Sequence, residues 1–426
     1  MSFNNFTTKL LSITDANIIF SDEIYEKKIN NLNTLVFNAT LTYKSYHCPK
    51  CGNCDNKKII KHGSKNSIVR ILPVNGQPAA IELKKQRFLC KECKSTFIAE
   101  TSLIKKFNSI SNRLKMNILN NLALKISETD IAKLNHVSHS TVSRYIDNSF
   151  NSYKPDFLSL PKNISFDEFK STKDAKGSMS FIFTDSQNKR IIDIVENRQL
   201  PFLIKYFSKF TKEARAMVET VCIDIYTPYM SLIKEMFPNA KIILDRFHIV
   251  NLLSRALNKT RINTMKNFST KSMQYKRLKR YWKLILKNFS DLNSSKFNKY
   301  VHFKEFKSLS TLVEDSINCK QCLKDTYDAY QIILSDIKNK NFRDLKIHLQ
   351  SFKDIISDGM KTSFNTLVEN IEYVENALIY AYSNGYTEGT NNYIKTLKKV
   401  AFGYKSYYHF RNRILITFNL REKINI

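Results

Sequence analysis

Residues 219–250 hold the pattern that most constrains how this chain can fold. Two short apolar runs each end at an aspartate, Asp224 and Asp245, and such runs are typical of central strands buried on both faces. Between them, Pro228 and the apolar spacing that follows predict a helix. In strand–helix–strand units the side chains just past the strand ends line the functional crevice. The stretch therefore predicts a metal site at that edge, unless the aspartates only cap helices.

The charge of the chain indicates a polyanionic partner. Its 426 residues carry 68 Lys and Arg against 38 Asp and Glu, a formal net charge of +30. Such a field favours nucleic acid over small neutral substrates, although a purely structural binder would share it. With 42% apolar and 12% aromatic residues the chain is expected to fold, and its length allows two or three domains.

Missing patterns narrow the function further. The chain has 8 glycines and neither G-x-x-x-x-G-K-[ST] nor G-x-G-x-x-G, so we expect no ATP site and no dinucleotide fold. No early segment has the pattern of a secretory leader, and the sequence contains no run of about 18 apolar residues. We therefore expect no membrane partner and a cytoplasmic, nucleoid-associated location.

Two close pairs of cysteines predict a zinc ribbon over residues 46–100. The four ligands are Cys48, Cys51, Cys90 and Cys93. Tight turns that each supply two thiolates suit a tetrahedral ion, and four protein ligands make the site structural rather than catalytic. Disulfides are the weaker alternative in a reducing cytoplasm, and Cys54 and neighbouring histidines leave the fourth ligand open. The sequence predicts no function for residues 1–45.

Residues 105–148 carry the pattern of a helix-turn-helix. Two brief helices are expected over 128–135 and 138–147, with Ser138 as the N-cap of the second. In this motif the second helix enters the major groove, so its exposed polar side chains are expected to reach base edges. These residues are His139, Ser140, Ser143 and Arg144. A plain helical hairpin is the alternative.

A second domain is expected after a linker at 149–162. Residues 164–169 alternate like a strand and present Asp167 near its end. Two further strands and a helix lead back to the stretch at 219–250. This order predicts a mixed α/β domain.

The chain after Asp245 reads as helical and strongly basic as far as about Ala377. Basic residues crowd around the only tryptophan. A solvated helical face is the ordinary interpretation, and phosphate tracking beside a stacking aromatic is the sharper one. On the sharper interpretation Arg277, Arg280 and Trp282 contact DNA.

The segment 382–399 supplies a third carboxylate. Glu388, Asn391, Asn392 and Lys395 follow one another at i, i+3, i+4 and i+7, so they share one helical face. Two further lysines, Lys398 and Lys399, are predicted to contact DNA. Glu388 can converge with the two strand-end aspartates Asp167 and Asp224, and carboxylate oxygens are the ligands that Mg²⁺ prefers.

Longer motifs resemble a known family over nearly the whole chain. They are the paired cysteines, the helix-turn-helix, SFDEF, VCIDIYTPY, FPNAKIILDRFHIV and SNGYTEGTNNYIKTLKKVAFGY. These pieces resemble bacterial insertion-sequence transposases of the ISL-three family. The resemblance implies a ribonuclease-H-like fold from residues 163–248 and 378–426, interrupted by a helical insertion at 249–377. It implies an Asp-Asp-Glu triad at Asp167, Asp224 and Glu388.

The function expected from these observations is that of a DNA transposase. It would bind the terminal inverted repeats and the target, both double-stranded DNA, as a homodimer or higher oligomer. It would cleave and join strands with two Mg²⁺ (or Mn²⁺) ions at the triad, and one structural Zn²⁺ would hold the ribbon. Residues expected to support the ligands are Asp245, His248, Asn392 and Lys395. A non-catalytic DNA-binding regulator derived from a transposase and a ribonuclease-H-like nuclease are the alternatives.

Overall fold

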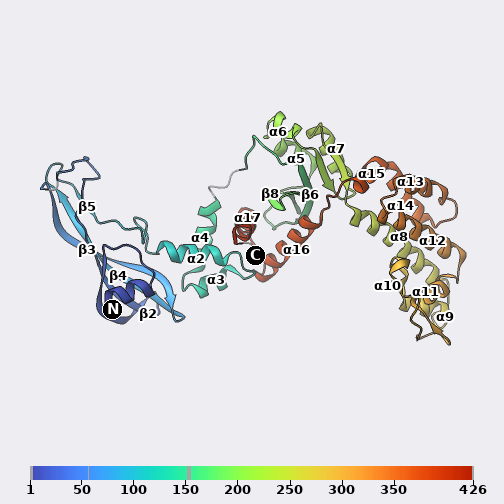
Figure 1. The fold of residues 1–426 in the computed structure, drawn as a ribbon, viewed down its shortest axis with the longest axis horizontal. Coiled ribbons are helices and arrows are strands. Elements are labelled where there is room, and N and C mark those ends of the chain that lie inside the picture. The colour runs from blue at the N-terminus through green and yellow to red at the C-terminus, as the bar shows by residue number, and fades with distance from the viewer. Residues whose placement is uncertain (1–2, 56, 151–154, 425–426) are drawn as a thin grey trace. The chain divides into compact units, whose positions relative to one another are not determined.

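The computed structural model describes residues 3–55, 57–150 and 155–424, which belong to two compact units. The first unit comprises 1–154 and 394–426, and the second comprises 155–393. The boundary falls within helix α16 (Gly385–Val400), so the predicted catalytic range 378–426 is divided between them (Figure 1). Residues 151–154 of the predicted linker lie outside the described residues.

The described part of the first unit contains a five-stranded sheet. Its strands are β1 (Ile18–Ile29), β2 (Leu32–Leu41), β3 (Ile59–Val74), β4 (Gln77–Cys90) and β5 (Thr96–Ile98), in the order β1-β2-β4-β3 with β5 paired to β4. Helix α1 (Phe3–Leu10) packs on β1. Because β2 runs parallel to β4, the predicted ranges 1–45 and 46–100 share one sheet and one core.

Both long hairpins of this sheet turn through two residues in the left-handed region. Asn30-Asn31 and Asn75-Gly76 have φ angles from 49° to 77°. Two positive φ angles match the twist of the flanking strands, which is why such turns favour Asn and Gly. The turns fix the strand register and so bring the apolar residues of β2, β3 and β4 into that core.

Helices complete the first unit as far as it is described. They are α2 (Asn112–Asn121), α3 (Glu128–Leu134), α4 (His139–Phe150) and α17 (Tyr407–Ile424). Helices α3 and α4 lie where the two brief helices were predicted, and the Ser138 hydroxyl accepts from the Thr141 N–H at 3.3 Å. Their apolar faces close on a core that includes Leu114, Ile131 and Val142.

The second unit contains a mixed sheet in the order β10-β9-β6-β7-β8. The strands are β6 (Asn163–Lys170), β7 (Met179–Asp185), β8 (Arg190–Val195), β9 (Thr220–Ile223) and β10 (Lys241–Leu244). Strands β6 to β8 are antiparallel, whereas β9 and β10 run parallel to β6. The connecting helices are α5 (Leu200–Phe207), α6 (Lys212–Ala216) and α7 (Thr227–Met236). The predicted mixed α/β order is confirmed.

Aromatic packing makes one face of this sheet rigid. Phe166, Phe181 and Phe183 from β6 and β7 meet Phe207 of α5, with ring centroids 5.2–6.0 Å apart. Successive strand residues point to opposite faces, so Phe166 faces this layer while Asp167 faces away from it. The apolar layer thereby holds the strand ends that carry the acidic residues.

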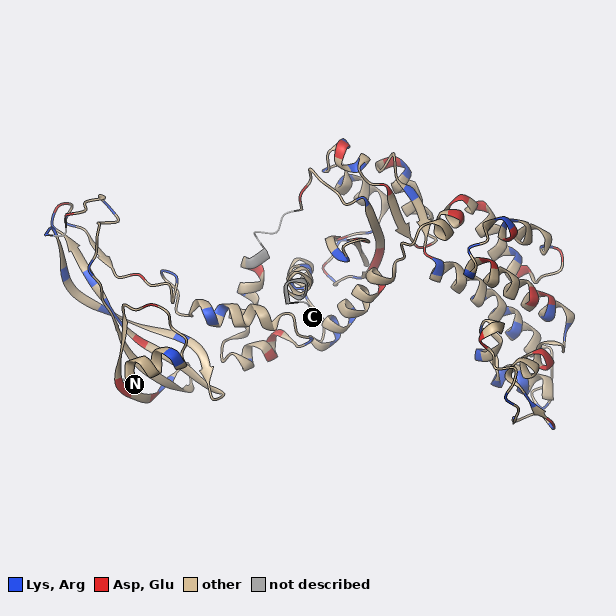
Figure 2. Cartoon of the chain, in the orientation of Figure 1, with Lys and Arg blue, Asp and Glu red and all other residues tan. Residues whose placement is uncertain are grey.

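Helices make up most of the remaining second unit, over the range in which the resemblance implies a helical insertion. They are α8 (Arg246–Lys266), α9 (Met273–Arg280), α10 (Trp282–Ile285), η1 (Phe289–Asp291), α11 (Leu309–Ile317), α12 (Gln321–Lys338), α13 (Phe342–Ser351), α14 (Asp358–Glu369) and α15 (Ile371–Ile379), with a short hairpin of β11 (Asn298–Lys299) and β12 (Phe306–Lys307). Figure 2 shows Lys and Arg in elements of both units. Among the described residues, no helix is both long and apolar enough to cross a membrane.

Candidate functional site

Three neighbouring strands carry aspartates at equivalent positions. The parallel registers pair Ser165 with Cys222 on β9, and Cys222 with Ile243 on β10. Two residues further along, the same registers align Asp167, Asp224 and Asp245. Asp167 and Asp224 were expected to be neighbours on adjacent strands, and the register adds Asp245 to the same row. We call these three residues the aspartate row.

Burial makes the carboxylates of this row repel one another. The pKa of Asp167 is raised to about 7, mainly by desolvation and also by the negative charges of Asp224 and Glu168, although hydrogen bonds from the Glu168 N–H and from Asn391 oppose the rise. Burial also raises the pKa of Asp224, although the charge of His248 opposes the change. A cation bound between such carboxylates would relieve their repulsion.

His248 and Asp245 flank Asp224. Nε2 of His248 lies 3.1 Å from Oδ1 of Asp224 and 4.0 Å from Oδ2 of Asp245. Ligand atoms of these three residues lie within 4.8 Å of one another, close enough to share an ion. The Asp245 carboxylate also accepts from the Phe247 N–H at 3.4 Å as the N-cap of α8. Asp245 is therefore both a helix cap and a member of the site.

Two asparagines connect helix α16 to the aspartate row. Asn384, directly before the helix, donates to Oδ1 of Asp224 at 3.3 Å. Asn391, within the helix, donates to Oδ2 of Asp167 at 2.6 Å. Both asparagines are buried. The predicted polar face included Asn391 but not Asn384, which stands in the turn before the helix, where helical spacing gives no signal.

Glu388 lies between these two asparagines on α16. It follows Asn384 by four residues and precedes Asn391 by three, so the three side chains share one helical face. The hydroxyls of Thr387 and Thr184, 2.8 Å apart, hold this turn of the helix on β7. The Glu388 side chain is exposed. Its carboxylate does not belong to the group of ligand atoms that Asp224, Asp245 and His248 form. The structure thus brings Asp167 and Asp224 together and places Glu388 on the helix beside them.

Two other residues of the predicted polar face point to solvent. Asn392 and Lys395 are both exposed. Lys395 belongs to the first compact unit, whereas the aspartate row belongs to the second. Their predicted supporting roles remain predictions.

Glu168 is an acidic neighbour that the sequence reasoning passed over. It follows Asp167 in the motif SFDEF, and it forms an ion pair with Arg198. It also accepts from the hydroxyl of Tyr229 at 2.8 Å, and burial followed by the charge of Glu168 raises the pKa of that tyrosine. The Glu168 carboxylate, next to the aspartate row, therefore already interacts with Arg198 and Tyr229.

The donor atoms of this site fit a hard divalent cation. Asp167 and Asp224 offer carboxylate oxygens, the ligand type that Mg²⁺ and Mn²⁺ prefer. Within the described residues, Oδ1 of Asn384 and Oδ1 of Asn391 are buried without a hydrogen-bond partner, and each belongs to a side chain that touches one of these aspartates. Buried polar atoms usually find partners, so these amide oxygens are suited to an ion or to its bound water.

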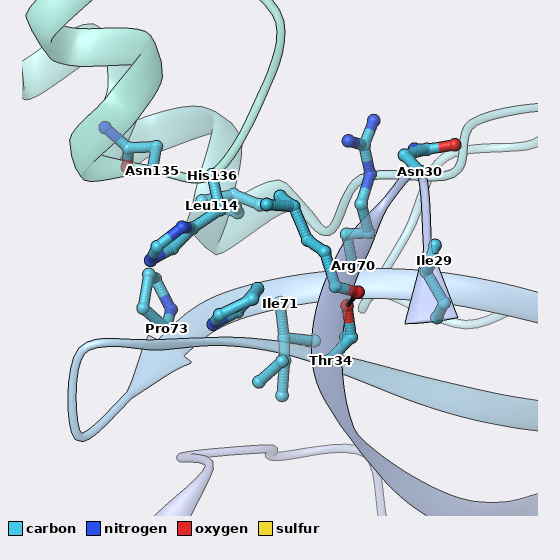
Figure 3. Close-up of a pocket in the computed structure, with 12 residues that line it drawn as sticks. Ile29, Asn30, Thr34, Arg70, Ile71, Pro73, Leu114, Asn135 and His136 are labelled. Atoms are coloured by element: carbon cyan, nitrogen blue, oxygen red, sulfur yellow. Dashed lines mark hydrogen bonds between the residues drawn. The ribbon is translucent and has the colours of Figure 1, made fainter. Parts of the chain in front are cut away.

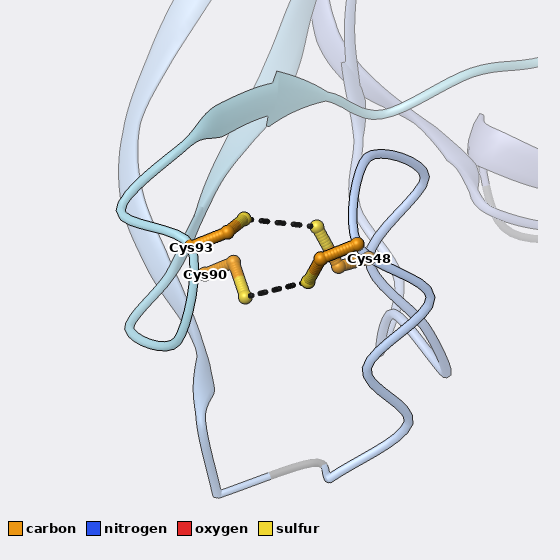
Figure 4. A group of neighbouring side chains, drawn as sticks. Cys48, Cys90 and Cys93 are labelled. Carbon is orange, nitrogen blue, oxygen red and sulfur yellow. Dashed lines mark hydrogen bonds between the residues drawn. The ribbon is translucent and has the colours of Figure 1, made fainter.

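The four predicted zinc ligands form a tight cluster in the first unit (Figure 4). Sγ of Cys48 lies 3.7 Å from Sγ of Cys93, and Sγ of Cys51 lies 3.8 Å from Sγ of Cys90. Tetrahedral zinc with Zn–S bonds of about 2.3 Å separates its sulfurs by about 3.8 Å. The cluster therefore has the dimensions of a structural zinc site. Cys54 stands apart, with its thiol 3.2 Å from the Gly52 carbonyl.

The α4 residues that were predicted to contact base edges differ in their exposure to solvent. His139, Ser140 and Arg144 are exposed, as a base-contacting face requires. Ser143 is half-buried and donates to the Glu128 carboxylate at 3.1 Å. Ser143 therefore positions the helix within the unit rather than presenting a free hydroxyl.

Helix α17 packs against these helices through a buried ionic cluster. Nε2 of His409 lies 3.0 Å from Oε1 of Glu128, and Nδ1 lies 2.8 Å from Oδ1 of Asp147. Burial alone would lower the pKa of His409, but Glu128 and Asp147 raise it to about 9. Arg413, also on α17, is fully buried and donates to the Leu122 carbonyl at 2.6 Å. Nothing in the sequence pattern pointed to this cluster.

The residues outside α4 that were predicted to contact DNA also differ in their exposure to solvent. The Arg277 guanidinium packs 4.0 Å from the Phe303 ring, and its Nε donates to the His302 carbonyl at 2.9 Å. Arg280 is exposed, and Trp282 retains 39% exposure. Lys399 is exposed, whereas Lys398 is half-buried. Arg277 is thus half-buried and bonded within the insertion, while Arg280, Trp282 and Lys399 are exposed.

A pocket in the first unit is lined mainly by apolar side chains. It is lined by apolar residues such as Ile71 and Leu114, together with Arg70 and His136 (Figure 3). Burial lowers the pKa of Arg70. Nε2 of His136 lies 2.9 Å from the Gly76 carbonyl oxygen, which joins the β3–β4 turn to the segment before α4.

Family models identify the class to which this fold and these sites belong. A model of DDE transposases, described as a transposase of the ISL3 type, matches residues 164–414, more than half of the chain. A second, described as the zinc-finger of transposase IS204/IS1001/IS1096/IS1165, matches residues 47–93 and covers the four clustered cysteines. The chain belongs to the ISL3 (ISL-three) family of transposases.

Two relatives match this chain over regions of very different length. The transposase for insertion sequence element IS1001 of Bordetella parapertussis is 19% identical over 391 residues, 88% of this chain and 90% of that protein. A protein named ATP-dependent protease from Lactococcus lactis subsp. lactis is 31% identical over 105 residues. That match covers 25% of this chain and 34% of the Lactococcus protein, so it supports no statement of activity.

Proposed function

We propose that this protein is the transposase of an insertion sequence, which binds the terminal inverted repeats and catalyses metal-dependent DNA strand cleavage and strand transfer. The observation that carries the proposal is the pairing of Asp167 and Asp224 in the aspartate row, with Asn384 and Asn391 holding the helix of Glu388 beside them. The strand order β8-β7-β6-β9-β10, with the last two strands parallel to β6, supports a ribonuclease-H-like catalytic domain.

Asp167, Asp224 and Glu388 would hold two Mg²⁺ or Mn²⁺ ions. Bound ions of this kind lower the pKa of an attacking water or hydroxyl and stabilise the leaving oxygen of a phosphodiester. Asn384 and Asn391 orient the two aspartates, because each donates to one oxygen of a carboxylate. His248 and Asp245 support Asp224 from its other side.

DNA binding is assigned to the zinc ribbon and to α2–α4, which we propose form a helix-turn-helix. Helix α4 would present His139, Ser140 and Arg144 to base edges in the major groove. The surface residues Arg280, Trp282 and Lys399 would contact phosphates and bases. We propose at least a dimer on DNA, because strand transfer requires two element ends together.

Conservative removal of one carboxylate tests the catalytic proposal. Asp167→Asn and Glu388→Gln are expected to reduce Mg²⁺-dependent cleavage and joining of an inverted-repeat duplex to background, while equilibrium binding of that duplex persists. Glu235→Gln, on the exposed face of α7, is the matched control and is expected to cut like the wild type. Cleavage by either triad variant would refute the assigned triad.

The same assay separates the two alternatives. A DNA-binding regulator would bind the duplex without nicking it under any divalent cation, even as the wild type. A ribonuclease-H-like nuclease would cut but leave paired ends unjoined. Joined products that require both Asp167 and Glu388 exclude both alternatives.

A further inference from the structure

Two phenylalanines of the first unit stand out for exposure and backbone conformation together. Phe402 is 99% exposed and Phe107 is 96% exposed, more than any other large apolar residue among those the structure describes. Both also have left-handed backbones, with φ of 53° and 65°. A bulky side chain disfavours this region, and exposure of an aromatic ring to water is unfavourable as well. Each position therefore combines two features that folding alone would avoid.

The backbone around Phe402 is a helix end at which glycine is the usual residue. After α16, the Gly403 N–H donates to the Lys398 carbonyl at 2.8 Å and the Phe402 N–H donates to the Lys399 carbonyl at 3.1 Å. This pair of bonds defines a Schellman motif, whose left-handed position normally carries glycine. Here the glycine stands one residue later, and the left-handed position holds a phenylalanine that projects into solvent.

Phe107 occupies a comparable position in a tight turn. The Asn108 N–H donates to the Lys105 carbonyl at 3.1 Å, so Phe107 is the third residue of a four-residue turn. A positive φ at this position is usually supplied by glycine or asparagine. The ring again points into solvent rather than into the core.

Lysines stand close to both phenylalanines in the sequence. Lys105 and Lys106 precede Phe107, and Nζ of Lys106 lies 5.6 Å from the centre of its ring. The turn at Phe402 is bordered by the exposed lysines Lys399 and Lys405. A ring flanked by cations matches a ligand that has both phosphates and flat apolar faces, which is the chemistry of a nucleic acid.

We propose that Phe402 and Phe107 are aromatic DNA contacts, each of which stacks on a base or inserts at a base step while the neighbouring lysines hold the phosphates. This inference rests on the proposed function and extends it to two residues outside α4. The left-handed backbone aims each ring away from the protein surface, so the ring reaches a base without rearrangement of the loop.

Substitution by glycine removes the aromatic ring without destabilising the fold, so it tests the effect of the ring on DNA affinity alone. Phe402→Gly and Phe107→Gly supply the residue that each backbone favours, so the thermal midpoint is expected to stay level or rise. Affinity for a duplex carrying the DNA that flanks the reading frame is expected to fall about 5- to 150-fold per ring, the range measured for loss of one stacked base. Phe306→Ala is the control, because Phe306 is 66% exposed but follows Glu305 in the other unit.

Salt dependence distinguishes stacking from phosphate contact. The glycine variants are expected to weaken binding without changing the slope of log affinity against log salt. Lys399→Gln is expected to reduce that slope by about 1. A changed slope in Phe402→Gly would overturn the stacking role.

A single-tryptophan reporter tests the contact directly. Phe402→Trp in a Trp282→Phe background carries one tryptophan, whose emission is expected to be quenched when the duplex is added at a concentration that saturates the Trp282→Phe parent protein. Phe306→Trp in the same background is expected to keep its emission. Quenching by anionic phospholipid vesicles but not by the duplex would overturn the proposal in favour of a membrane surface.

The outcomes also separate this inference from the proposed function. If the wild type fails to bind the flanking-DNA duplex more tightly than a random duplex, the proposed function fails. If the wild type binds and both glycine variants bind as tightly as Phe306→Ala, the aromatic contacts fail while the proposed function stands.

Discussion

The two candidate metal sites of this protein are assembled in opposite ways. The zinc site takes two ligands from each of two short turns, so the spacing of the cysteines already determines much of its geometry. The proposed acidic site would take its ligands from β6, from the end of β9 and from α16, which are far apart in the sequence and depend on the fold of the second unit for their positions. A site made from local turns depends on its ion for structure, whereas a site made from a sheet depends on the sheet.

The largest structural effect is expected from removal of a zinc ligand. Cys90→Ser should abolish bound zinc and leave the two cysteine turns without amide-exchange protection, because metal binding in such modules is coupled to folding. Zinc content by atomic absorption and hydrogen exchange measure the two effects. Cys54→Ser is the matched control, since its thiol lies outside the cluster. Zinc loss from Cys54→Ser with zinc retained by Cys90→Ser would reverse the ligand assignment.

A smaller effect is expected when the acidic site loses a side chain that positions its ligands. Asn391→Ala removes the 2.6 Å hydrogen bond to Asp167 and should reduce Mg²⁺-dependent cleavage about 10- to 100-fold, the usual cost of losing such a partner. The second unit should remain folded by circular dichroism. Asn365→Ala, on an exposed part of α14, should cleave normally. Equal rates for the two variants would mean that Asn391 does not position the site.

The smallest effect concerns the ionic cluster of α17, which contains no metal and depends on pH. Glu128 and Asp147 raise the folded-state pKa of His409 from 6.5 to about 9. His139, Arg413 and Tyr404 also face Glu128. A raised pKa stabilises the fold fully below about pH 6.5, and this contribution is lost as pH rises through about 9.

His409→Gln should therefore lower the thermal midpoint of the first unit by about 2–4 °C at pH 6. The difference from the wild type should shrink between pH 7 and pH 10. His62→Gln, at an exposed strand position, serves as the control and should show no such trend. A difference that is constant with pH would assign His409 a packing role alone.

The same contrast explains how much could be read from the sequence. Cysteine spacing identified the four thiols that the structure clusters, and apolar runs identified the strands β9 and β10. The apolar runs also placed Asp224 and Asp245 at the ends of two strands of one strand–helix–strand unit, and the parallel registers align both with Asp167. Local pattern also did not show that Arg277, predicted to contact DNA, packs on the Phe303 ring and donates to the His302 carbonyl.

The N-terminal strands and α17 show the limits of local pattern most clearly. Residues 1–45 have no function-bearing motif, yet β2 lies at the centre of the first unit because β4 pairs with it in parallel. Helix α17 follows the predicted catalytic motif in sequence but packs in the first unit, where Arg413 binds the carbonyl at the end of α2. Pairings between distant segments decide both positions.

The packing of α17 has a consequence for synthesis of the protein. The ribosome must translate all of residues 155–393 before it makes the helix that covers α2–α4. A nascent chain therefore carries an unfinished first unit for most of its synthesis, with the carbonyls that Arg413 binds still open to water. Polypeptides that stop short of residue 407 lack this helix, so prematurely terminated products would leave the apolar core of α2–α4 partly uncovered.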